Sequence, residues 1–143
     1  EQLGERLCAL AGMQKVFFCN SGAEANETAL KLARLHGHRK QVAQPQILVM
    51  ENAFHGRTLA TLAATGNAAK QQGFEPQMPG FVRVPYDDID AVRRAAREAP
   101  GIVAVLVEPV QGEGGIRVAS TDYLRALRGK AARIVERRDN SEK

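Results

Sequence analysis

Residues 20–27 read Asn-Ser-Gly-Ala-Glu-Ala-Asn-Glu and follow directly on the apolar run Val16–Cys19. This run is rich in aromatic side chains and is closed by turn residues, which predicts a short buried strand. After the turn, alanines and leucines recur at helical spacing up to Gly37, so we expect a helix that ends there. A strand, a turn of small residues and a helix in this order indicate an α/β domain.

The turn itself has the features of an anion-binding site. Ser21 and Glu24 have the spacing of a capping box, in which the serine hydroxyl and the carboxylate each accept a backbone N–H. The start of a helix leaves N–H groups unpaired and carries a partial positive charge. Gly22 has no side chain that would keep an anion away from this backbone. The sequence therefore predicts a seat for a phosphate or carboxylate at Ser21, Gly22 and Ala23, with an ordinary capped helix as the alternative.

Length and composition predict one globular domain. The chain has 143 residues, of which 44% are hydrophobic and 25% are charged, and this is enough to bury a core. No apolar stretch is long enough to span a membrane, and no secretory signal pattern opens the chain. The first residues resemble the middle of an amphipathic helix and include no initiator Met, so we expect a segment of a longer protein.

The excess positive charge is local. Seven basic and three acidic residues from Arg125 onward account for the whole net charge of +4. Because the remainder is balanced, we expect neither a nucleic-acid-binding face nor a membrane partner. A solvated, frayed basic tail over residues 129–143 is the interpretation that fits this distribution.

The two cysteines and three histidines do not predict a metal site. Cys8 and Cys19 stand in apolar sequence, so we expect buried free thiols and a reducing compartment such as the cytoplasm. His36, His38 and His55 do not combine with them at any familiar zinc spacing.

Strand and helix patterns alternate along the chain, which predicts a three-layer α/β fold with a mainly parallel sheet flanked by helices. The run Ile102–Val107 is entirely apolar, so we expect it to be covered on both faces. The other expected elements are a helix over 1–13, a strand over 47–50, a helix over 57–64, a loop over 68–80, a strand over 81–85, a helix capped by Asp87 or Asp88 and running to Ala99, a loop over 108–115, and a last helix capped by Ser120 or Thr121.

Three loops follow predicted strands, at 20–24, 52–57 and 108–115. Ligands of open parallel sheets bind beyond the carboxyl ends of the strands, so we expect these loops to meet at one edge. In the second loop, Phe54 has the chemistry to stack on a flat heterocycle and Arg57 to hold a carboxylate. A packed phenylalanine, a surface arginine and a structural His55 are the alternatives.

The third loop carries two carboxylates and three glycines. Glu108 follows the apolar strand directly, so we place it near a crevice, and Glu113 stands on a loop from which it reaches a cation. Ordinary turn carboxylates are the alternative for both. The glycine spacing over 112–115 does not match a dinucleotide-binding fingerprint, and the chain has no phosphate-binding loop ending in Gly-Lys-Ser/Thr. The pattern therefore disfavours nucleotide binding.

Taken together, residues 18–27, 54–58 and 107–115 resemble the class III aminotransferases, which use pyridoxal 5′-phosphate (PLP). The resemblance covers about residues 1–127 with order and spacing preserved, and it implies part of the large domain of a fold-type I PLP enzyme. Position by position, it implies that the cofactor is bound by Ser21, Gly22, Ala23, Phe54, His55 and Glu108. It further implies that Arg57 binds a substrate carboxylate and that Glu113 lies at the substrate end.

The resemblance also implies a reaction and an assembly. Within the family it favours transfer of an amino group from N-acetylornithine to 2-oxoglutarate in arginine biosynthesis, and a homodimer. Relatives acting on succinylornithine, ornithine or 4-aminobutyrate are alternatives.

In the family, a lysine binds the cofactor aldehyde and an aspartate contacts the pyridinium nitrogen. Both lie beyond the last matching stretch, and none of the six lysines here is at the family's position, so we expect the chain alone to be inactive. A non-catalytic phosphate-binding module and a defunct product with exposed sheet edges are the other interpretations.

Overall fold

The computed structural model describes residues 1–129, whose central sheet contains three parallel strands in the order β2-β1-β3. The strands are β1 (Gln46–Met50), β2 (Phe81–Val84) and β3 (Ile102–Val105). Ile47 pairs with Phe81 on one side, and Gln46 pairs with Ile102 on the other. The expected basic tail lies, from residue 130 onward, outside the described residues.

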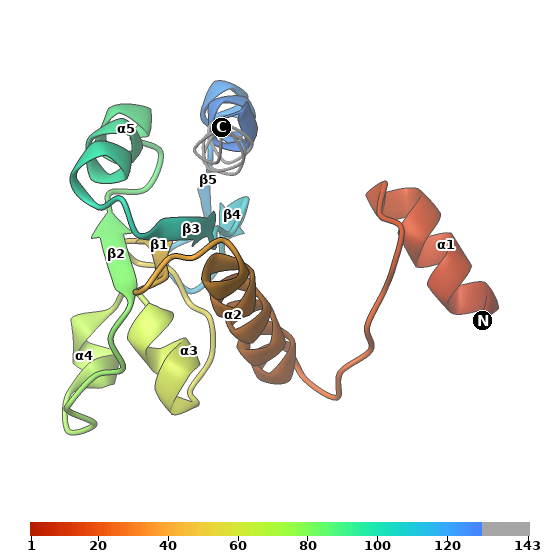
Figure 1. Ribbon diagram of the computed structural model, residues 1–143, viewed down its shortest axis with the longest axis horizontal. Helices are drawn as coiled ribbons and strands as arrows, with labels where there is room; N and C mark the ends of the chain where they lie inside the picture. Colours follow the sequence, from red (N-terminus) through yellow and green to blue (C-terminus); the bar gives the residue numbers. More distant parts are fainter. Residues whose placement is uncertain (130–143) are drawn as a thin grey trace.

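Helices cover both faces of this sheet (Figure 1). On one face lie α2 (Gly22–Arg39) and α3 (Leu59–Ala64), and on the other lie α5 (Ile89–Glu98) and the helix of residues 121–129. Because side chains alternate along a strand, β1 supplies both cores. Ile47 and Val49 pack with Leu30, whereas Leu48 and Met50 pack with the other pair of helices. The predicted three-layer α/β fold is confirmed.

The most apolar run is not the central strand. Within the described part of the chain, β3 has β1 as its one neighbour, and the residues from Ala104 to Val107 are only half-buried. The residues Ile47 to Met50 of β1 are instead 1% exposed or less. An apolar sequence indicates that helices cover the faces of a strand, but it does not indicate whether the strand has a neighbour on each side within the sheet. Ile102, Val105 and Val107 nevertheless pack in one core, and Ala104 and Leu106 pack against the other. The expectation that Ile102–Val107 is covered on both faces is therefore confirmed, although the run lies at the edge of the described sheet.

The predicted strand Val16–Cys19 is also wrong. These residues form no strand, and Phe17 and Phe18 are 73% and 57% exposed. The run pairs with no strand of the described sheet and lies outside both hydrophobic cores, so its apolar composition is not used to form a strand. The run instead connects α2 to the preceding helix, α1 (Gln2–Ala11). This helix stands apart from the sheet in Figure 1 and has no buried residue.

Neither cysteine is buried as expected. Cys8 on α1 and Cys19 beside the turn are both half-buried free thiols. Their apolar neighbours in sequence belong to the part of the chain that stays outside the two cores, so their burial could not follow from local composition.

Gly37 does not end α2, which continues to Arg39. A Cβ atom on Gly37 would lie 2.7 Å from Pro45 Cβ and 2.9 Å from Val103 Cγ1. The glycine therefore allows close packing of the helix on β3, and the expectation that the helix ends at Gly37 is wrong.

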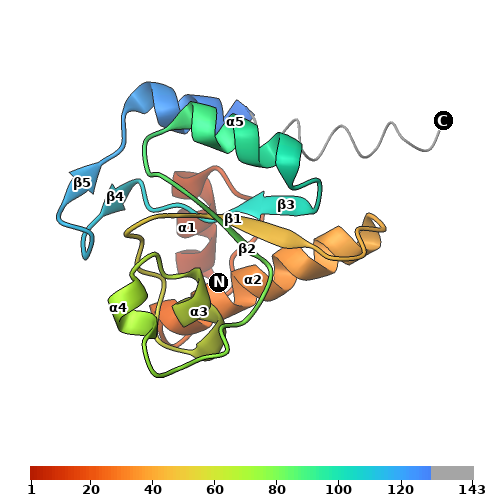
Figure 2. The same ribbon diagram turned by 90° about the vertical axis from the view of Figure 1, so that its left-hand side faces the viewer.

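Two predicted loops contain short elements. Residues 68–80 include α4 (Ala68–Gln71), and residues 108–115 include β4 (Val110–Gln111), which pairs with β5 (Arg117–Val118) in a small antiparallel hairpin. Figure 2 shows this hairpin and α4 at the same end of the sheet. No helix within residues 1–129 has the length and apolarity needed to cross a membrane.

Candidate active site

The first part of the site is the start of α2. Ser21 Oγ accepts the Glu24 N–H at 3.3 Å, and the Glu24 carboxylate accepts the Asn20 N–H at 2.7 Å, one residue earlier than in a standard capping box. The N–H groups of Gly22 and Ala23 have no acceptor among residues 1–129. A Cβ atom on Gly22 would meet nothing within 4 Å. Two unpaired donors at the positive end of a helix therefore face open space, as the predicted phosphate seat requires.

The second part is the loop after β1, which is fastened to α2. Asn26 Nδ2 donates to the His55 carbonyl oxygen at 2.7 Å, and the Thr58 hydroxyl donates to the Glu27 carboxylate. Gly56 has a φ of 133°, and a Cβ atom there would lie 2.5 Å from Thr61 Oγ1. Thr61 belongs to α3, and the same Cβ atom would lie 3.2 Å from Ala23 Cβ in the first turn of α2. Only a glycine fits between these two helices, so the loop packs closely against both.

His55 belongs to this loop, which forms one wall of the site, and only 4% of its surface is exposed. The backbone N–H of His55 donates to Thr65 Oγ1 at 3.1 Å, and the imidazole Nε2 atom has no partner in the described structure. Burial, followed by the nearby Arg83 guanidinium, lowers the pKa of His55 to about 4. The imidazole is therefore neutral at neutral pH. Its cofactor-binding role stays a prediction.

The third part is Glu108, which links two strand ends. Its Oε2 atom accepts the Phe54 N–H at 2.8 Å. The Tyr86 hydroxyl lies 2.9 Å from the carbonyl oxygens of both Glu108 and Pro109. The ring of Tyr86 also meets that of Tyr123 edge to face, with centroids 6.0 Å apart. Tyr86 therefore fixes the backbone that carries Glu108, and Glu108 in turn fixes Phe54.

Lys70 meets Glu113 above the ring of Phe54. Lys70 Nζ lies 2.7 Å from Glu113 Oε2 and 4.7 Å from the centroid of the Phe54 ring. The hydrogen bond and charge of Lys70, together with the charge of Arg57, lower the pKa of Glu113. A cavity of about 130 Å³ opens here between β1, α4 and the hairpin, and its lining includes Asn52, Asn67 and Gly114.

Gln111 of β4 is fully buried and ties the hairpin to the end of β1. Its Nε2 atom donates to the Glu51 carbonyl oxygen at 2.9 Å, while its Oε1 atom has no partner within residues 1–129. A Cβ atom on Gly114 would lie 2.7 Å from the Asn52 carbonyl oxygen. The hairpin therefore approaches the end of β1 too closely for any larger residue.

The structure thus brings together the three loops that the sequence placed at one edge. The first loop follows no strand, but α2 carries it to the same place. Arg57 is exposed and has no ion pair in the described part of the chain, so its guanidinium is available to a ligand. Sequence reasoning missed Lys70, Tyr86 and Gln111, because each acts through a contact distant in sequence and no local pattern marks it.

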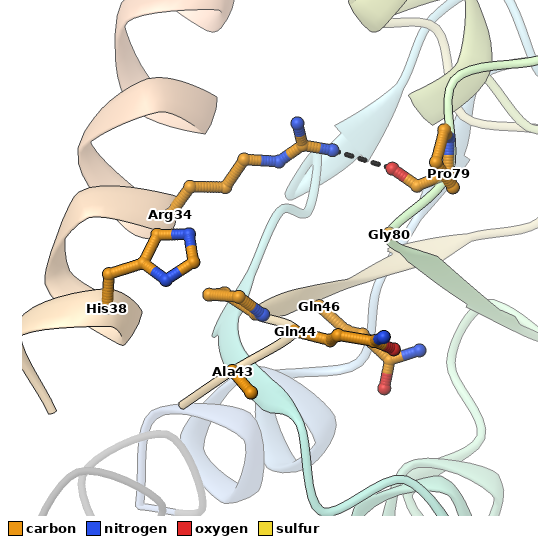
Figure 3. Close-up of a pocket in the computed structure, with 8 residues that line it drawn as sticks. Arg34, His38, Ala43, Gln44, Gln46, Pro79 and Gly80 are labelled. Atoms are coloured by element: carbon orange, nitrogen blue, oxygen red, sulfur yellow. Dashed lines mark hydrogen bonds between the residues drawn. The ribbon is translucent and has the colours of Figure 1, made fainter. Parts of the chain in front are cut away.

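A second, larger pocket lies at the opposite edge of the sheet (Figure 3). It has a volume of about 470 Å³ and is lined by Arg34 and His38 of α2 and by the segments before β1 and β2. Arg34 Nη2 donates to the Pro79 carbonyl oxygen at 2.6 Å, so the guanidinium has a structural role. Parallel sheets bind ligands at the carboxyl ends of their strands, and this pocket lies at the amino ends.

The fold and this site define the class of protein. The family model for aminotransferase class-III matches residues 1–133, and the chain belongs to this family. The chain is 58% identical over 128 residues to an acetylornithine aminotransferase of Nitrosomonas europaea, a match that covers 90% of this chain and 33% of the relative.

Solved structures agree with this assignment. A Bacillus anthracis aminotransferase superposes with a TM-score of 0.83 at 31% identity, covering 93% of this chain and 34% of that one. A PLP-bound amine transaminase from an uncultivated Pseudomonas species superposes with a TM-score of 0.82 at 26% identity, covering 93% of this chain and 35% of that one. The chain spans about a third of the length of these proteins.

Proposed function

We propose that the whole protein transfers an amino group from N-acetylornithine to 2-oxoglutarate with PLP as cofactor, in the cytoplasm, as a homodimer and as part of arginine biosynthesis. Family membership and the 58% identity to an acetylornithine aminotransferase support the reaction. The observation that carries the proposal is the convergence at one sheet edge of unpaired N–H donors, an aromatic ring and an arginine. These are the groups that a phosphate, a flat ring and a carboxylate need.

The residues present fit PLP. The open space before Gly22 and the two unpaired N–H groups suit a phosphate. The half-buried ring of Phe54 suits a pyridine ring. Two buried polar atoms of the site, His55 Nε2 and Gln111 Oε1, have no partner among residues 1–129. When bound, PLP supplies an electron sink for the carbanion formed at the substrate's α-carbon.

The residues of this chain bind the phosphate and the substrate carboxylate and orient the cofactor ring. The N–H groups of Gly22 and Ala23 bind the phosphate, and Glu108 holds Phe54 so that the ring keeps one position. Neutral His55 adds no charge to the wall, so anions are attracted to the start of α2 and to Arg57. Arg57 holds a substrate carboxylate through two parallel hydrogen bonds.

A second function, cofactor or phosphate binding without catalysis, is favoured for the chain by itself. The unpaired donors, the Phe54 ring and Arg57 all lie within residues 1–129. Calorimetric titration of the chain with pyridoxine 5′-phosphate tests this, because that ligand has the ring and the phosphate but no aldehyde. We expect saturable binding that Gly22→Asp abolishes by placing a carboxylate in the seat. Gly22→Ala is the matched control and should bind, because its added Cβ meets nothing within 4 Å.

The reaction itself is tested on the full-length protein that contains this segment. We expect glutamate formation from N-acetylornithine and 2-oxoglutarate, with a higher kcat/KM than for ornithine, succinylornithine or 4-aminobutyrate. A preference for one of those three donors would contradict the proposed substrate and leave the family assignment intact.

A further inference from the structure

The ammonium group of Lys70 covers one face of the Phe54 ring. Lys70 Nζ lies 4.7 Å from the ring centroid and 2.7 Å from the Glu113 carboxylate. A cation on an aromatic face is attracted by the electrons of the ring, and the carboxylate attracts the same cation. The two contacts therefore keep a charged side chain over Phe54.

A flat ring that stacks on this face needs the space that Lys70 occupies. Stacked aromatic rings have centroids about 4.5–7 Å apart, and Lys70 Nζ lies within this layer. The cavity lined by Phe54, Lys70 and Glu113 has a volume of about 130 Å³, whereas pockets for small organic ligands typically have about 300 Å³ or more. A ring can therefore enter from this side only if a lining side chain moves.

The backbone on both sides of the cavity is held by close contacts, so the side-chain pair is the part that can move. Gln71, next to Lys70 in α4, donates from Nε2 to two carbonyl oxygens at the end of α3, at 3.0 and 2.8 Å. Next to Glu113, a Cβ atom on Gly114 would lie 2.7 Å from the Asn52 carbonyl oxygen. The side chains of Lys70 and Glu113 are 30% and 55% exposed. Ion pairs between such exposed groups are weak, so Lys70 can leave Phe54 without a rearrangement of the backbone.

We propose that Lys70 competes with a bound ring for the face of Phe54, so that the Lys70–Glu113 pair is an autoinhibitory contact of the site. This inference rests on the proposed function, because the phosphate seat at the start of α2 brings the ring to Phe54. A ligand that has both a phosphate and an aromatic ring must displace Lys70. Inorganic phosphate uses only the start of α2 and leaves the pair intact. The contact therefore lowers the affinity for the ring and not that for the phosphate.

Calorimetric titration of the Lys70→Ala chain tests this competition. Alanine is a good helix former, so it suits α4, and it removes both contacts of Lys70. Because a cation–π contact and an exposed ion pair are each weak, we expect the affinity for pyridoxine 5′-phosphate, relative to that for inorganic phosphate, to rise about three- to tenfold. The matched control is Lys31→Ala, which removes an exposed lysine of α2 and should leave this ratio unchanged.

The ratio of the two affinities separates competition from the loss of a positive charge. Removing the Lys70 charge weakens the attraction for any anion, and this effect is present in both titrations. Only the ligand with a ring gains from an uncovered Phe54. An unchanged or lower ratio in Lys70→Ala would overturn the proposal. Circular dichroism checks that each variant is folded.

Chemical acetylation of the wild-type chain follows Lys70 directly. The chain is treated briefly with N-hydroxysuccinimidyl acetate, digested, and mapped by mass spectrometry, with the exposed Lys31 as the internal reference. Saturation with pyridoxine 5′-phosphate should raise the labelling of Lys70 relative to that of Lys31, because the displaced amine enters solvent. Unchanged or lower labelling would mean that Lys70 stays in place under the bound ring, and would overturn the proposal.

These outcomes are distinct from the failure of the proposed function. Saturable binding with an unchanged affinity ratio would overturn the competition and leave the phosphate seat standing. Binding of pyridoxine 5′-phosphate by Lys70→Ala and not by the wild-type chain would support the competition in its strongest form. No binding of either ligand by either chain would overturn the phosphate seat, and the competition with it.

Discussion

Replacing Tyr86 by phenylalanine removes a single hydroxyl group that supports the site from the opposite face of the sheet. The hydroxyl lies 2.9 Å from the carbonyl oxygens of Glu108 and Pro109. Pro109 also accepts the Ala119 N–H at 3.1 Å and so keeps a partner, whereas the Glu108 carbonyl oxygen loses the only donor described for it. The aromatic ring and its contact with Tyr123 stay in place.

The expected cost is that of one neutral hydrogen bond, about 1 kcal/mol in the free energy of unfolding. Because Glu108 positions Phe54 through a hydrogen bond of 2.8 Å, we also expect pyridoxine 5′-phosphate to bind about two to five times more weakly, the equivalent of up to about 1 kcal/mol. Inorganic phosphate uses only the start of α2, so its affinity should not change.

Urea unfolding and calorimetric titration measure these two effects. Tyr123→Phe is the matched control, because its hydroxyl lies 3.1 Å from Met50 Sδ in the core and makes no hydrogen bond to Glu108 or Pro109 in the described structure. It should change ligand affinity in neither titration. Equal losses of affinity in the two variants, or an equal loss for inorganic phosphate in Tyr86→Phe, would refute the reasoning that Tyr86 acts through Glu108 on Phe54.

Three further predictions concern Gly37, His55 and Glu108. Gly37→Ala should lower the unfolding free energy in urea by about 1–3 kcal/mol, because its Cβ would overlap Pro45 and Val103; an unchanged value would contradict the packing argument. His55 has a pKa of about 4 in the folded state against 6.5 unfolded, so the unfolded chain binds more protons and stability should fall by up to about 3 kcal/mol between pH 6.5 and pH 4. Urea titrations over this range should lose the slope in His55→Gln but keep it in the exposed His38→Gln. Glu108→Ala should cost about 1–3 kcal/mol in urea by leaving the Phe54 N–H unpaired, whereas Glu108→Gln retains an acceptor and should cost less; equal costs would contradict the assigned bond.

The sequence located the elements whose causes are local. The β1 run is apolar and lies between turns, and Asp88 caps α5 by accepting the Ala91 N–H at 2.8 Å. The predicted turn at Ser21 is present, because capping follows from neighbouring residues. The loops after β1 and β3 meet as predicted, because parallel strands end at the same edge of the sheet. The first loop reaches this edge for another reason, since it follows no strand and is bound there through α2.

Features that depend on distant partners could not be predicted in this way. A strand needs a neighbour, so the apolar residues Val16–Cys19 gave a strand pattern without a strand. Position 37 requires a glycine because Pro45 and Val103 lie too close for a side chain. Lys70 is held in the site by its hydrogen bond to Glu113, which is 43 residues later in the sequence. Asp87 has the composition of a helix cap, yet it has a φ of 64° and accepts hydrogen bonds from Ser120 instead.

The central claim is that the start of α2 and the Phe54 loop form one binding site for a phosphorylated ring. The most direct measurement is an NMR titration of the ¹⁵N-labelled chain with pyridoxine 5′-phosphate. We predict that the amide signals of Gly22, Ala23 and Phe54 shift together and saturate with one dissociation constant. Saturation confined to the pocket around Arg34 and His38, or the absence of any saturable shift at Gly22 and Phe54, would contradict the claim.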